Sequence, residues 1–527
     1  MSTEATKPSN PASANPEIMR DAMYFEPGFR GWLQAATSFP AVLTLVMIGV
    51  QFFYSMYRPD MNDPDVWWHI RNAQYLLQHH QLPRFDMYSF TVAGHPWINH
   101  EWLSEIPYYL AYRAFGLVGL KSLTFLMLSI IFLLLLYLSF QASGNFKASV
   151  TACCYSTLLA TVSFGPRSIL FGYVYLVVLL IILQRFRMRG NAPLWVIPPL
   201  FCLWANTHGS WSLGLILFFL IAVSGLVGGT WGRIDSVRWT REQRRRLFLT
   251  GVASVAALFV NPFGWRLVYY PFDLAFRQKL NIMHVAEWVP LEVNNFRGKM
   301  GLALVLILLV SALVRNRRWN LGEVLALLFG IYCGFSYIRF LVLLGIVAAP
   351  VLAGALDFFP RYRPLEDTRK VNTVAILLLL GLMAYFWPRE AKVRQSMEET
   401  YPAGVLPYLQ AHPPQGNVLN FYLWGGYLGW HDPQMKVFID SRVDIFEYAG
   451  VFKDYLELLG ADNLQRRPDV LLDKYKIQYV LFPASDSKNP LHVAGELAYV
   501  LEHGPQWKTL YKDKVCVLLE KQPVTAR

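Results

Sequence analysis

Long apolar segments recur along most of the chain and limit what it can fold into. A helix crosses a bilayer core with roughly 20 apolar residues, in a range of about 17–25. Only 16% of the 527 residues are charged, against about 25% in ordinary soluble domains. We therefore expect a polytopic α-helical membrane protein with about 11 spans, some of them short. The expected spans lie near 37–57, 118–141, 147–163, 168–185, 192–207, 209–228, 247–262, 298–315, 320–337, 339–357 and 372–388.

Basic residues fall in short loops between these segments. Their clusters at 185–189, 233–246, 315–318 and 361–370 are the kind of signal that marks cytoplasmic loops. With the N-terminus inside, all of these clusters lie inside, provided that the segment "LSEIPYYLAYRAFG" (103–116) does not cross. We predict that this segment is an amphipathic helix on the outer surface. The net charge of +12 is thereby explained by orientation, and we expect no nucleic-acid partner.

Three regions of different composition follow from these patterns. Residues 1–36 begin polar and Pro-rich and are expected to form a disordered cytoplasmic tail. Residues 37–388 form the membrane domain, with a first external loop at 58–117. Residues 389–527 have short apolar runs and are expected to form an extracytoplasmic soluble α/β domain. Its strands are predicted at 417–423, 436–442, 477–482 and 514–520, and its helices near 402–411, 447–459 and 491–503.

The first external loop opens with the densest acid, imidazole and indole cluster of the chain, "NDPDVWWHIRN". Asp63 and Asp65 stand at the start of a helical pattern, where Asp and Pro are favoured. Helix capping is therefore one interpretation of Asp63, and a favourable interaction with the helix dipole is one of Asp65. Neither explains why Trp67, Trp68 and His69 follow at once. The two Trp residues fit an interfacial aromatic belt or a platform for the partly apolar face of a sugar.

The same loop continues with "GHPWINHEWLSE" (94–105), which contains His100, Glu101 and Glu105. Histidine and carboxylates are suitable metal ligands, so a divalent metal is one interpretation. The spacing matches no metal motif such as HExxH, and we assign no metal-binding residue. Acid–base chemistry or acceptor positioning by the carboxylates and simple loop packing are the other interpretations.

Further polar residues lie at the outer ends of apolar segments. Arg167 lies in "FGPRSILFGY" and Arg339 in "SYIRFLV", while His208 and Glu287 lie in other outer loops. A cation at membrane depth is costly and is usually paired. A lipid phosphate suits the planar guanidinium, which bonds it bidentately; snorkelling to the interface is the alternative. We predict that the first-loop carboxylates and these guanidinium groups line one common pocket.

The stretch "DPDVWWHIRNAQYLL" after the first apolar segment resembles the opening of the first external loop in polyprenyl-phosphate-dependent, C-type (GT-C) glycosyltransferases. The layout is similar as well, with many spans, a surface helix in a long first outer loop, and an outer C-terminal domain. "ANTHGS", "NPFGWRLVYYP" and "WGGYLGW…KVFIDSRVD" are similar to segments of bacterial multi-pass membrane proteins of that superfamily. The chain lacks a WWDYG-like motif, which argues against transfer to asparagine.

The resemblance implies a glycosyltransferase of the bacterial inner (cytoplasmic) membrane. It would move a sugar from a polyprenyl-phosphate donor to a glycan, lipid or protein acceptor by inverting displacement. The alternatives are a transporter or flippase for lipid-linked sugars, and a non-catalytic scaffold for envelope assembly. The implied site residues are the catalytic carboxylates Asp63, Asp65 and Glu101, the donor-phosphate ligands Arg167 and Arg339, and the sugar or acceptor contacts Trp67, Trp68, His69, His100, His208 and Glu287.

Overall fold

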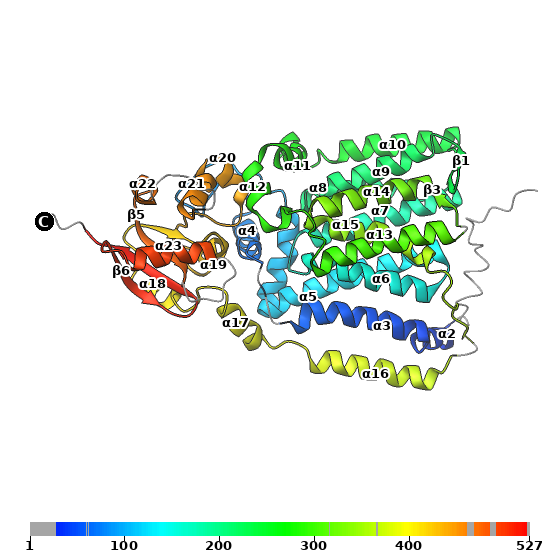
Figure 1. The fold of residues 1–527 in the computed structure, drawn as a ribbon, viewed down its shortest axis with the longest axis horizontal. Coiled ribbons are helices and arrows are strands. Elements are labelled where there is room, and N and C mark those ends of the chain that lie inside the picture. The colour runs from blue at the N-terminus through cyan, green and yellow to red at the C-terminus, as the bar shows by residue number, and fades with distance from the viewer. Residues whose placement is uncertain are drawn as a thin grey trace, which may run out of the picture.

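Apolar helices that run roughly side by side make up the larger part of the molecule, and a small sheet domain covers one end of this bundle (Figure 1). The computed structural model describes residues 28–58, 61, 63–315, 317–364, 367–460, 468–484 and 492–523. Every apolar segment expected from the sequence contains a helix. These helices are α3 (Phe39–Phe52), α5 (Trp102–Ser143), α6 (Phe146–Ala160), α7 (Ile169–Arg189), α8 (Ile197–Thr207), α9 (Trp211–Ser224), α10 (Arg241–Ala257), α13 (Phe296–Val314), α14 (Leu321–Ser336), α15 (Leu341–Ala355) and α16 (Arg369–Tyr385).

Fewer of these helices reach full membrane length than the sequence suggested. Among the described residues, 5 helices are long and apolar enough to cross a membrane, or 6 if α16 and α17 (Glu390–Glu398), bent by 55°, form one span. Shorter apolar helices cover Leu194–Thr207, Trp211–Ser224 and Leu321–Ser336. A helix rises about 1.5 Å per residue, so one with fewer than about 18 residues falls short of a core about 30 Å thick. The helical membrane architecture is confirmed, and the number of spans is not.

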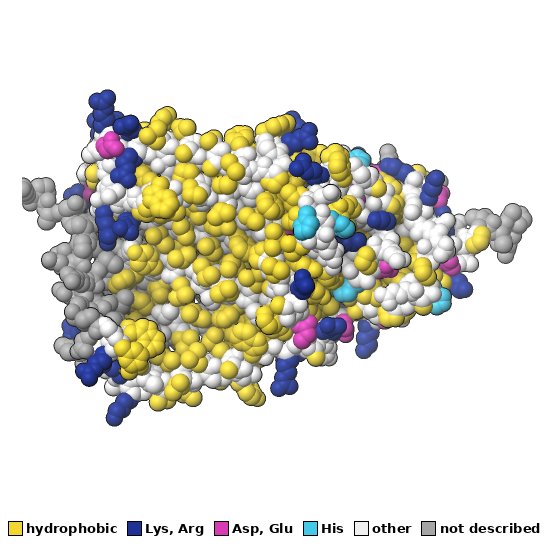
Figure 2. Space-filling model, turned by 180° about the vertical axis from the view of Figure 1, so that it is seen from behind, with side chains coloured by type: hydrophobic (Ala, Val, Ile, Leu, Met, Phe, Trp, Pro, Cys, Tyr) yellow, Lys and Arg dark blue, Asp and Glu magenta, His cyan; other side chains and the backbone are white. Residues whose placement is uncertain are grey.

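The surface of the bundle is divided into bands (Figure 2). A broad apolar belt separates two ends of the molecule that both carry Lys and Arg side chains, and the sheet domain lies at one of these ends. Side chains of α13 and α16 contribute to the exposed apolar surface, among them Leu309, Val310 and Leu377. An exposed apolar surface of this extent requires an apolar partner. The belt therefore has the distribution that contact with lipid tails needs.

The predicted basic clusters meet at the end of the bundle opposite the sheet domain. Arg233 donates to the carbonyl oxygen of Arg315 at 2.7 Å, and Arg246 donates to Asn191 at 3.1 Å. Arg315 also pairs with Asp357 at 2.5 Å. A minor sheet of β1 (Gly229–Trp231), β2 (Ile234–Ser236) and β3 (Trp319–Asn320) joins two of the loops there. Sequence-distant basic loops thus share one face, as the orientation argument required.

Helix α5 contains both the predicted surface helix 103–116 and the span that follows it. Its helical geometry breaks at Phe115 and at Gly116, where φ is 60°. A side chain at Gly116 would be strained by this φ and would bring Cβ within 2.6 Å of the Glu390 carboxylate. That carboxylate accepts hydrogen bonds from the N–H groups of Leu117 and Val118 at 3.1 and 3.0 Å. It thereby satisfies donors that the restarted helix leaves free.

The sheet domain is built on four strands in the order β4-β5-β7-β6. β4 (Asn417–Asn420) is parallel to β5 (Ile477–Pro483), and β7 (Cys516–Lys521) is antiparallel to both β5 and β6 (Trp507–Lys512). β6 was not predicted. The helices of the domain are α18 (Leu406–Ala411), α19 (Gly425–His431), α20 (Val443–Tyr448), α21 (Val451–Leu458), α22 (Pro468–Lys474) and α23 (His492–Glu502).

The prediction of a strand at 436–442 is wrong. Val437 makes one isolated parallel bridge, with Ser89 of the first loop. Arg442 explains the difference, because its buried guanidinium pairs with Asp440 at 2.6 Å and with Asp86 at 2.7 Å. Backbone hydrogen bonds between Val437 and the first-loop residues Tyr88 and Phe90, together with this buried ion pair, hold the segment against the first loop instead of the sheet.

The first loop and two short helices lie between the bundle and the sheet domain (Figure 1). The first loop contains α4 (Asp65–His79), and the two short helices are α11 (Trp265–Arg277) and α12 (Lys279–His284). The prediction of a disordered tail over residues 1–36 is wrong for its last residues, which form the amphipathic helix α2 (Phe29–Ala36) at the other end of the molecule. Residues 1–27 of the predicted tail lie outside the described residues.

Candidate functional site

Asp63 joins the start of α4 to the loop before α7. Its Oδ1 accepts a hydrogen bond from the N–H of Asp65 at 3.0 Å, so it stabilises the turn that opens the helix. Its Oδ2 forms an ion pair with Nε of Arg167, a residue far away in the sequence. Asp63 is 6% exposed. The capping interpretation and the functional one are therefore both compatible with the same side chain.

Arg167 is bound on two sides by carboxylates. Its Nη1 pairs with Oε1 of Glu287, and its own carbonyl accepts a hydrogen bond from the Tyr108 hydroxyl at 2.8 Å. Burial alone would lower the pKa of Arg167, but the charges of Asp63 and Glu287 raise it. The guanidinium is thus fixed in place and fully charged.

Arg339 lies in the short turn η5 (Ile338–Phe340), and its charge acts on the Glu287 carboxylate that also binds Arg167. Its guanidinium carbon lies 4.2 Å from the centre of the Trp288 ring. Burial alone would raise the pKa of Glu287, but the charges of Arg167 and Arg339 lower it. The Nε atom of Arg339 is buried and has no hydrogen-bond partner within the described part of the chain. A buried donor of this kind is costly unless a ligand satisfies it.

Asp65 is held differently from Asp63. Its Oδ1 accepts from Nε1 of Trp68 at 3.2 Å, and the same nitrogen lies 3.1 Å from Oγ of Ser441 in the sheet domain. Burial raises the pKa of Asp65 to about 7, and the negative charge of Asp63 adds to the rise. A carboxyl group that exchanges its proton near neutral pH is suited to acid–base chemistry.

Glu101 contacts three imidazoles, two from the first external loop and one from the loop that contains His208. Its Oε2 lies 3.4 Å from Nε2 of His69, and its Oε1 lies 3.6 Å from His100 and 3.3 Å from His208. Ser168 donates to Oε1 at 2.6 Å. Burial alone would raise the pKa of Glu101, but the three imidazoles and this hydroxyl lower it to about 2. The carboxylate stays ionised and already has donors on both oxygens.

His69 bridges two carboxylates. Its Nδ1 lies 3.1 Å from Oε1 of Glu105, and its Nε2 faces Glu101. Burial alone would lower the pKa of His69, but the bond to Glu105 and the charge of Glu101 raise it to about 9. Asn72 and Asn99 donate to Glu105 at 3.0 and 2.8 Å. Glu105 was noted in the sequence but not assigned to the site; its position one helical turn after Glu101 was the available signal.

His208 provides a neutral imidazole. Its Nδ1 accepts a hydrogen bond from the N–H of Ser210 at 3.0 Å, so the ring proton lies on Nε2, which faces Glu101. Burial lowers the pKa of His208 to about 3 despite that carboxylate. His69 and His208, which both face Glu101, therefore differ in charge at neutral pH.

The two tryptophans of α4 have different surroundings. Trp67 is fully buried and packs edge-on against Tyr401 and Tyr427, at ring-centre distances of 5.8 and 5.1 Å. It contacts the sheet domain and not the carboxylates. Trp68 lies beside Asp65, with the Trp97 ring 5.7 Å away. All other residues assigned from the sequence lie in the connected cluster of acids, imidazoles and guanidinium groups.

The described residues contain no group of side chains arranged to bind a metal ion. No three His, Cys, Asp or Glu side chains among them are placed to hold one ion together. The donor set explains this, because Glu101 contacts imidazoles that point their nitrogens at its oxygens and not at a shared centre.

Comparison with known proteins gives a match in fold only. No family model and no curated protein matches the sequence. The oligosaccharyltransferase of Archaeoglobus fulgidus, solved with a tethered acceptor peptide, matches with a TM-score of 0.51 at 13% identity, over 92% of this chain and 74% of that one. Its apo form gives 0.50 at 12% identity over the same shares. ArnT from Cupriavidus metallidurans bound to undecaprenyl phosphate gives 0.48 at 13% identity, over 91% and 97%.

Proposed function

Because the chain has the fold of the C-type (GT-C) glycosyltransferases, we propose that it is a membrane glycosyltransferase. The donor is a sugar on a polyprenyl phosphate, and the acceptor presents a hydroxyl group on the side of the sheet domain. One observation carries the proposal. Asp63, Arg167 and Glu287 form a continuous ion-pair chain beside both Asp65 and Arg339.

The guanidinium groups provide the donor-phosphate site. Arg167 is charged but already paired with two carboxylates, so we assign it the role of positioning its neighbours. Arg339 keeps a buried Nε without a partner in the described structure. Arginine binds phosphate oxygens through a planar fork of donors. Arg339 is therefore the residue to which we assign the phosphate of the lipid donor.

Asp65 is assigned as the general base. The acceptor oxygen forms a bond to the anomeric carbon of the sugar while its proton passes to the Asp65 carboxylate. The bond from that carbon to the phosphate oxygen breaks, and its electron pair leaves with polyprenyl phosphate. Attack from the face opposite the phosphate inverts the configuration. With a pKa of about 7, Asp65 balances the fraction ionised against basicity near neutral pH.

Glu101 and Asp63 are assigned positioning roles. Glu101 has a pKa of about 2 and already accepts from several donors, which makes it a weak base. It holds the imidazoles of His69, His100 and His208 beside the site. Asp63 fixes Arg167 and raises the pKa of Asp65 through its charge.

We infer the placement in the membrane from the distribution of charge. The basic loops lie together at the end opposite the sheet domain, and such loops mark the cytoplasmic side. We therefore assign the site and the sheet domain to the extracytoplasmic side of a bacterial inner membrane. A lipid-borne donor can reach a site at this edge of the apolar belt by lateral diffusion.

Binding of the lipid phosphate tests the proposal. The purified chain in nanodiscs is titrated with undecaprenyl phosphate and with undecaprenol, and bound lipid is measured by native mass spectrometry. We expect the phosphate to bind more tightly than the alcohol, and Arg339→Gln to remove most of that preference. Arg318→Gln, which removes an exposed ion pair with Asp235 at the other end of the bundle, leaves it unchanged. Equal binding of phosphate and alcohol by the unaltered chain contradicts the proposal.

A further inference from the structure

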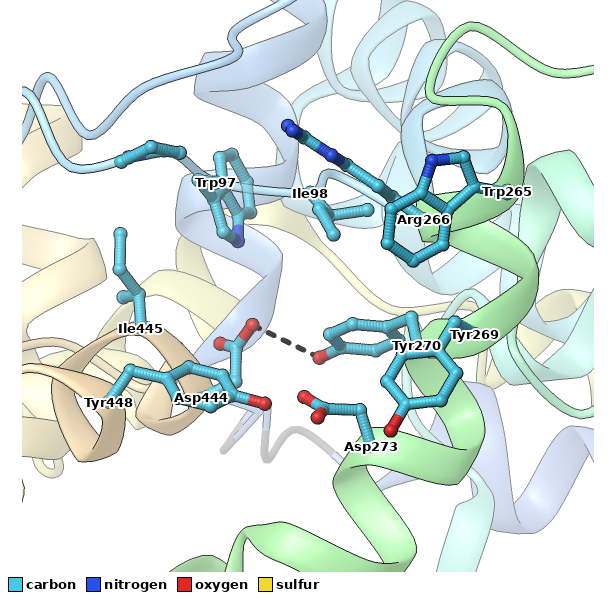
Figure 3. Close-up of a pocket in the computed structure, with 11 residues that line it drawn as sticks. Trp97, Ile98, Trp265, Arg266, Tyr269, Tyr270, Asp273, Asp444, Ile445 and Tyr448 are labelled. Carbon is cyan, nitrogen blue, oxygen red and sulfur yellow. Dashed lines mark hydrogen bonds between the residues drawn. The ribbon is translucent and has the colours of Figure 1, made fainter.

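A cavity lies where the first loop, α11 and α20 meet (Figure 3). It has a volume of about 270 Å³, close to the lower end of the roughly 300–1,000 Å³ typical of small-ligand sites. It is lined by Pro96, Trp97, Ile98, Trp265, Arg266, Tyr269, Tyr270, Asp273, Asp444, Ile445 and Tyr448. None of the residues to which the proposed transfer reaction assigns a role lines this cavity.

The lining combines aromatic faces with polar groups of both signs. Trp265, Tyr269 and Tyr448 are 63%, 42% and 57% exposed, so their rings are available to a ligand. Asp273 and Asp444 present carboxylates toward the space, and Arg266 lies on another wall (Figure 3). A sugar ring has a partly apolar face that packs on an aromatic ring. Its hydroxyl groups donate to carboxylates and accept from a guanidinium.

The aromatic residues of the lining favour a polar ligand over a lipid chain. Each of the five carries an N–H or O–H group, namely Trp97, Trp265, Tyr269, Tyr270 and Tyr448. Phe272 and Phe276 are exposed on the same helix α11 and do not line the cavity. Rings with a polar atom are placed where one side is apolar and the other is wet.

The polar groups also distinguish a neutral ligand from a cation. Asp273 lies 3.7 Å from Arg277, and Asp444 accepts a hydrogen bond from Tyr270 at 3.1 Å. Arg266 adds a further positive charge to the lining. The carboxylates are thus partly balanced and do not form a purely anionic cage. Groups of both signs match the donors and acceptors of a polyhydroxylated molecule.

One wall of the cavity is shared with the candidate site. The Tyr270 ring stacks on His100, with ring centres 4.3 Å apart and planes 30° apart. His100 in turn lies 3.6 Å from Glu101, and its buried Nδ1 has no hydrogen-bond partner among the residues described. A molecule held in the cavity therefore lies one ring pair away from the acid and imidazole cluster.

We infer that this cavity binds the carbohydrate portion of the acceptor, so that the acceptor is a glycan or a glycosylated molecule. That the bound carbohydrate belongs to the acceptor rests on the proposed function. Carbohydrate binding by the cavity stands on the lining itself. The acceptor hydroxyl that reacts then belongs to a part of the molecule that extends past Tyr270 and His100.

Direct binding tests the inference without any turnover. Methyl glycosides of glucose, galactose, mannose, N-acetylglucosamine and arabinose are added separately to the purified full chain in nanodiscs. Saturation-transfer NMR then measures binding, with ethylamine as the cationic probe. We expect at least one glycoside to bind with a Kd of about 1 mM or lower, a free energy of roughly −4 kcal/mol. Ethylamine is expected not to compete.

Variants assign the binding to the cavity. Trp265→Ala should weaken the glycoside by at least about tenfold, or 1.4 kcal/mol, and Trp265→Phe should retain most of the affinity because a ring remains. Trp195→Ala removes another exposed tryptophan, 76% exposed and outside the cavity lining, and should change nothing. Absence of glycoside binding, unaltered binding by Trp265→Ala, or competition by ethylamine overturns the inference.

The same assay separates this inference from the proposed function. Asp65→Asn should bind the glycoside as the unaltered chain does, because Asp65 does not line the cavity. If the glycoside binds while undecaprenyl phosphate is not preferred over undecaprenol, the transferase proposal fails and the carbohydrate site stands. If the lipid phosphate binds and no glycoside does, the inference alone fails.

Discussion

Replacing His69 by Gln should remove a pH-dependent part of the stability of the protein. His69 lies buried between two carboxylates, forming a hydrogen bond with Glu105 and an ion pair with Glu101. Its pKa is raised from 6.5 to about 9. The folded state therefore holds a proton that the unfolded chain releases between these values. A group with a raised pKa stabilises the fold fully below its unfolded pKa, and this contribution is lost as pH rises through its folded pKa.

The magnitude follows from the shift. The difference between 9 and 6.5 is 2.5, and each pKa unit corresponds to about 1.36 kcal/mol. The proton on His69 therefore stabilises the fold by about 3 kcal/mol below pH 6.5. Between pH 6.5 and 9 the free energy of unfolding should fall by about 1.4 kcal/mol per pH unit from this group alone. A glutamine at position 69 does not titrate, so its variant lacks this slope.

Unfolding in mixed micelles titrated with sodium dodecyl sulfate, at a series of pH values, measures the effect. The quantity compared is the difference in the free energy of unfolding between the unaltered chain and His69→Gln. This difference should be largest below pH 6.5 and shrink towards pH 9. His79→Gln, at the exposed end of the same helix α4, serves as the control. Parallel pH profiles for the unaltered chain and His69→Gln refute a buried imidazolium at this position.

Two further substitutions test the electrostatics of the fold and of the site. Arg442→Met leaves the buried carboxylates of Asp86 and Asp440 without their partner. We therefore expect it to lower the free energy of unfolding by about 3–5 kcal/mol in the same assay. A decrease of less than about 1 kcal/mol contradicts this expectation. Glu287→Gln removes a negative charge beside the guanidinium groups, so we expect it to bind undecaprenyl phosphate severalfold more tightly. The control Glu323→Gln breaks the 2.5 Å ion pair with Arg187 at the other end of the bundle and should leave this binding unchanged. Weaker or unchanged binding by Glu287→Gln contradicts the assignment of the lipid phosphate to the guanidinium groups beside Glu287.

Sequence patterns predicted the apolar helices, and they also named most of the residues that lie together in the candidate site. Apolar length marks a buried or lipid-facing helix wherever it occurs. Polar residues at the outer ends of such helices come together because the bundle aligns those ends. This alignment is why Asp63 and Arg167 were assigned to one pocket and are found in contact.

Features that depend on long-range contacts were not predictable in the same way. The short apolar run of "KVFIDSR" (436–442) is typical of a buried strand, but its Arg442 pairs with Asp86 of a distant loop and fixes the segment there. Trp67 and Trp68 are adjacent in the sequence, and a helix separates adjacent side chains by about 100°. Only the position of the sheet domain decides that Trp67 is buried against it while Trp68 lies beside Asp65.

The account depends most on Asp65 as the base, and the rate of sugar transfer as a function of pH tests this most directly. Release of undecaprenyl phosphate from undecaprenyl-phosphate-linked hexoses is followed from pH 5 to 9, with short oligosaccharides of the panel sugars as acceptors, since these extend beyond the cavity. For the unaltered chain the rate should rise about tenfold per pH unit and level off above a pH of about 7. Asp65→Asn should be slower by about 10²–10⁴-fold and lack that rise. If Asp65→Asn transfers sugar at the unaltered rate with the same pH profile, Asp65 is not the base.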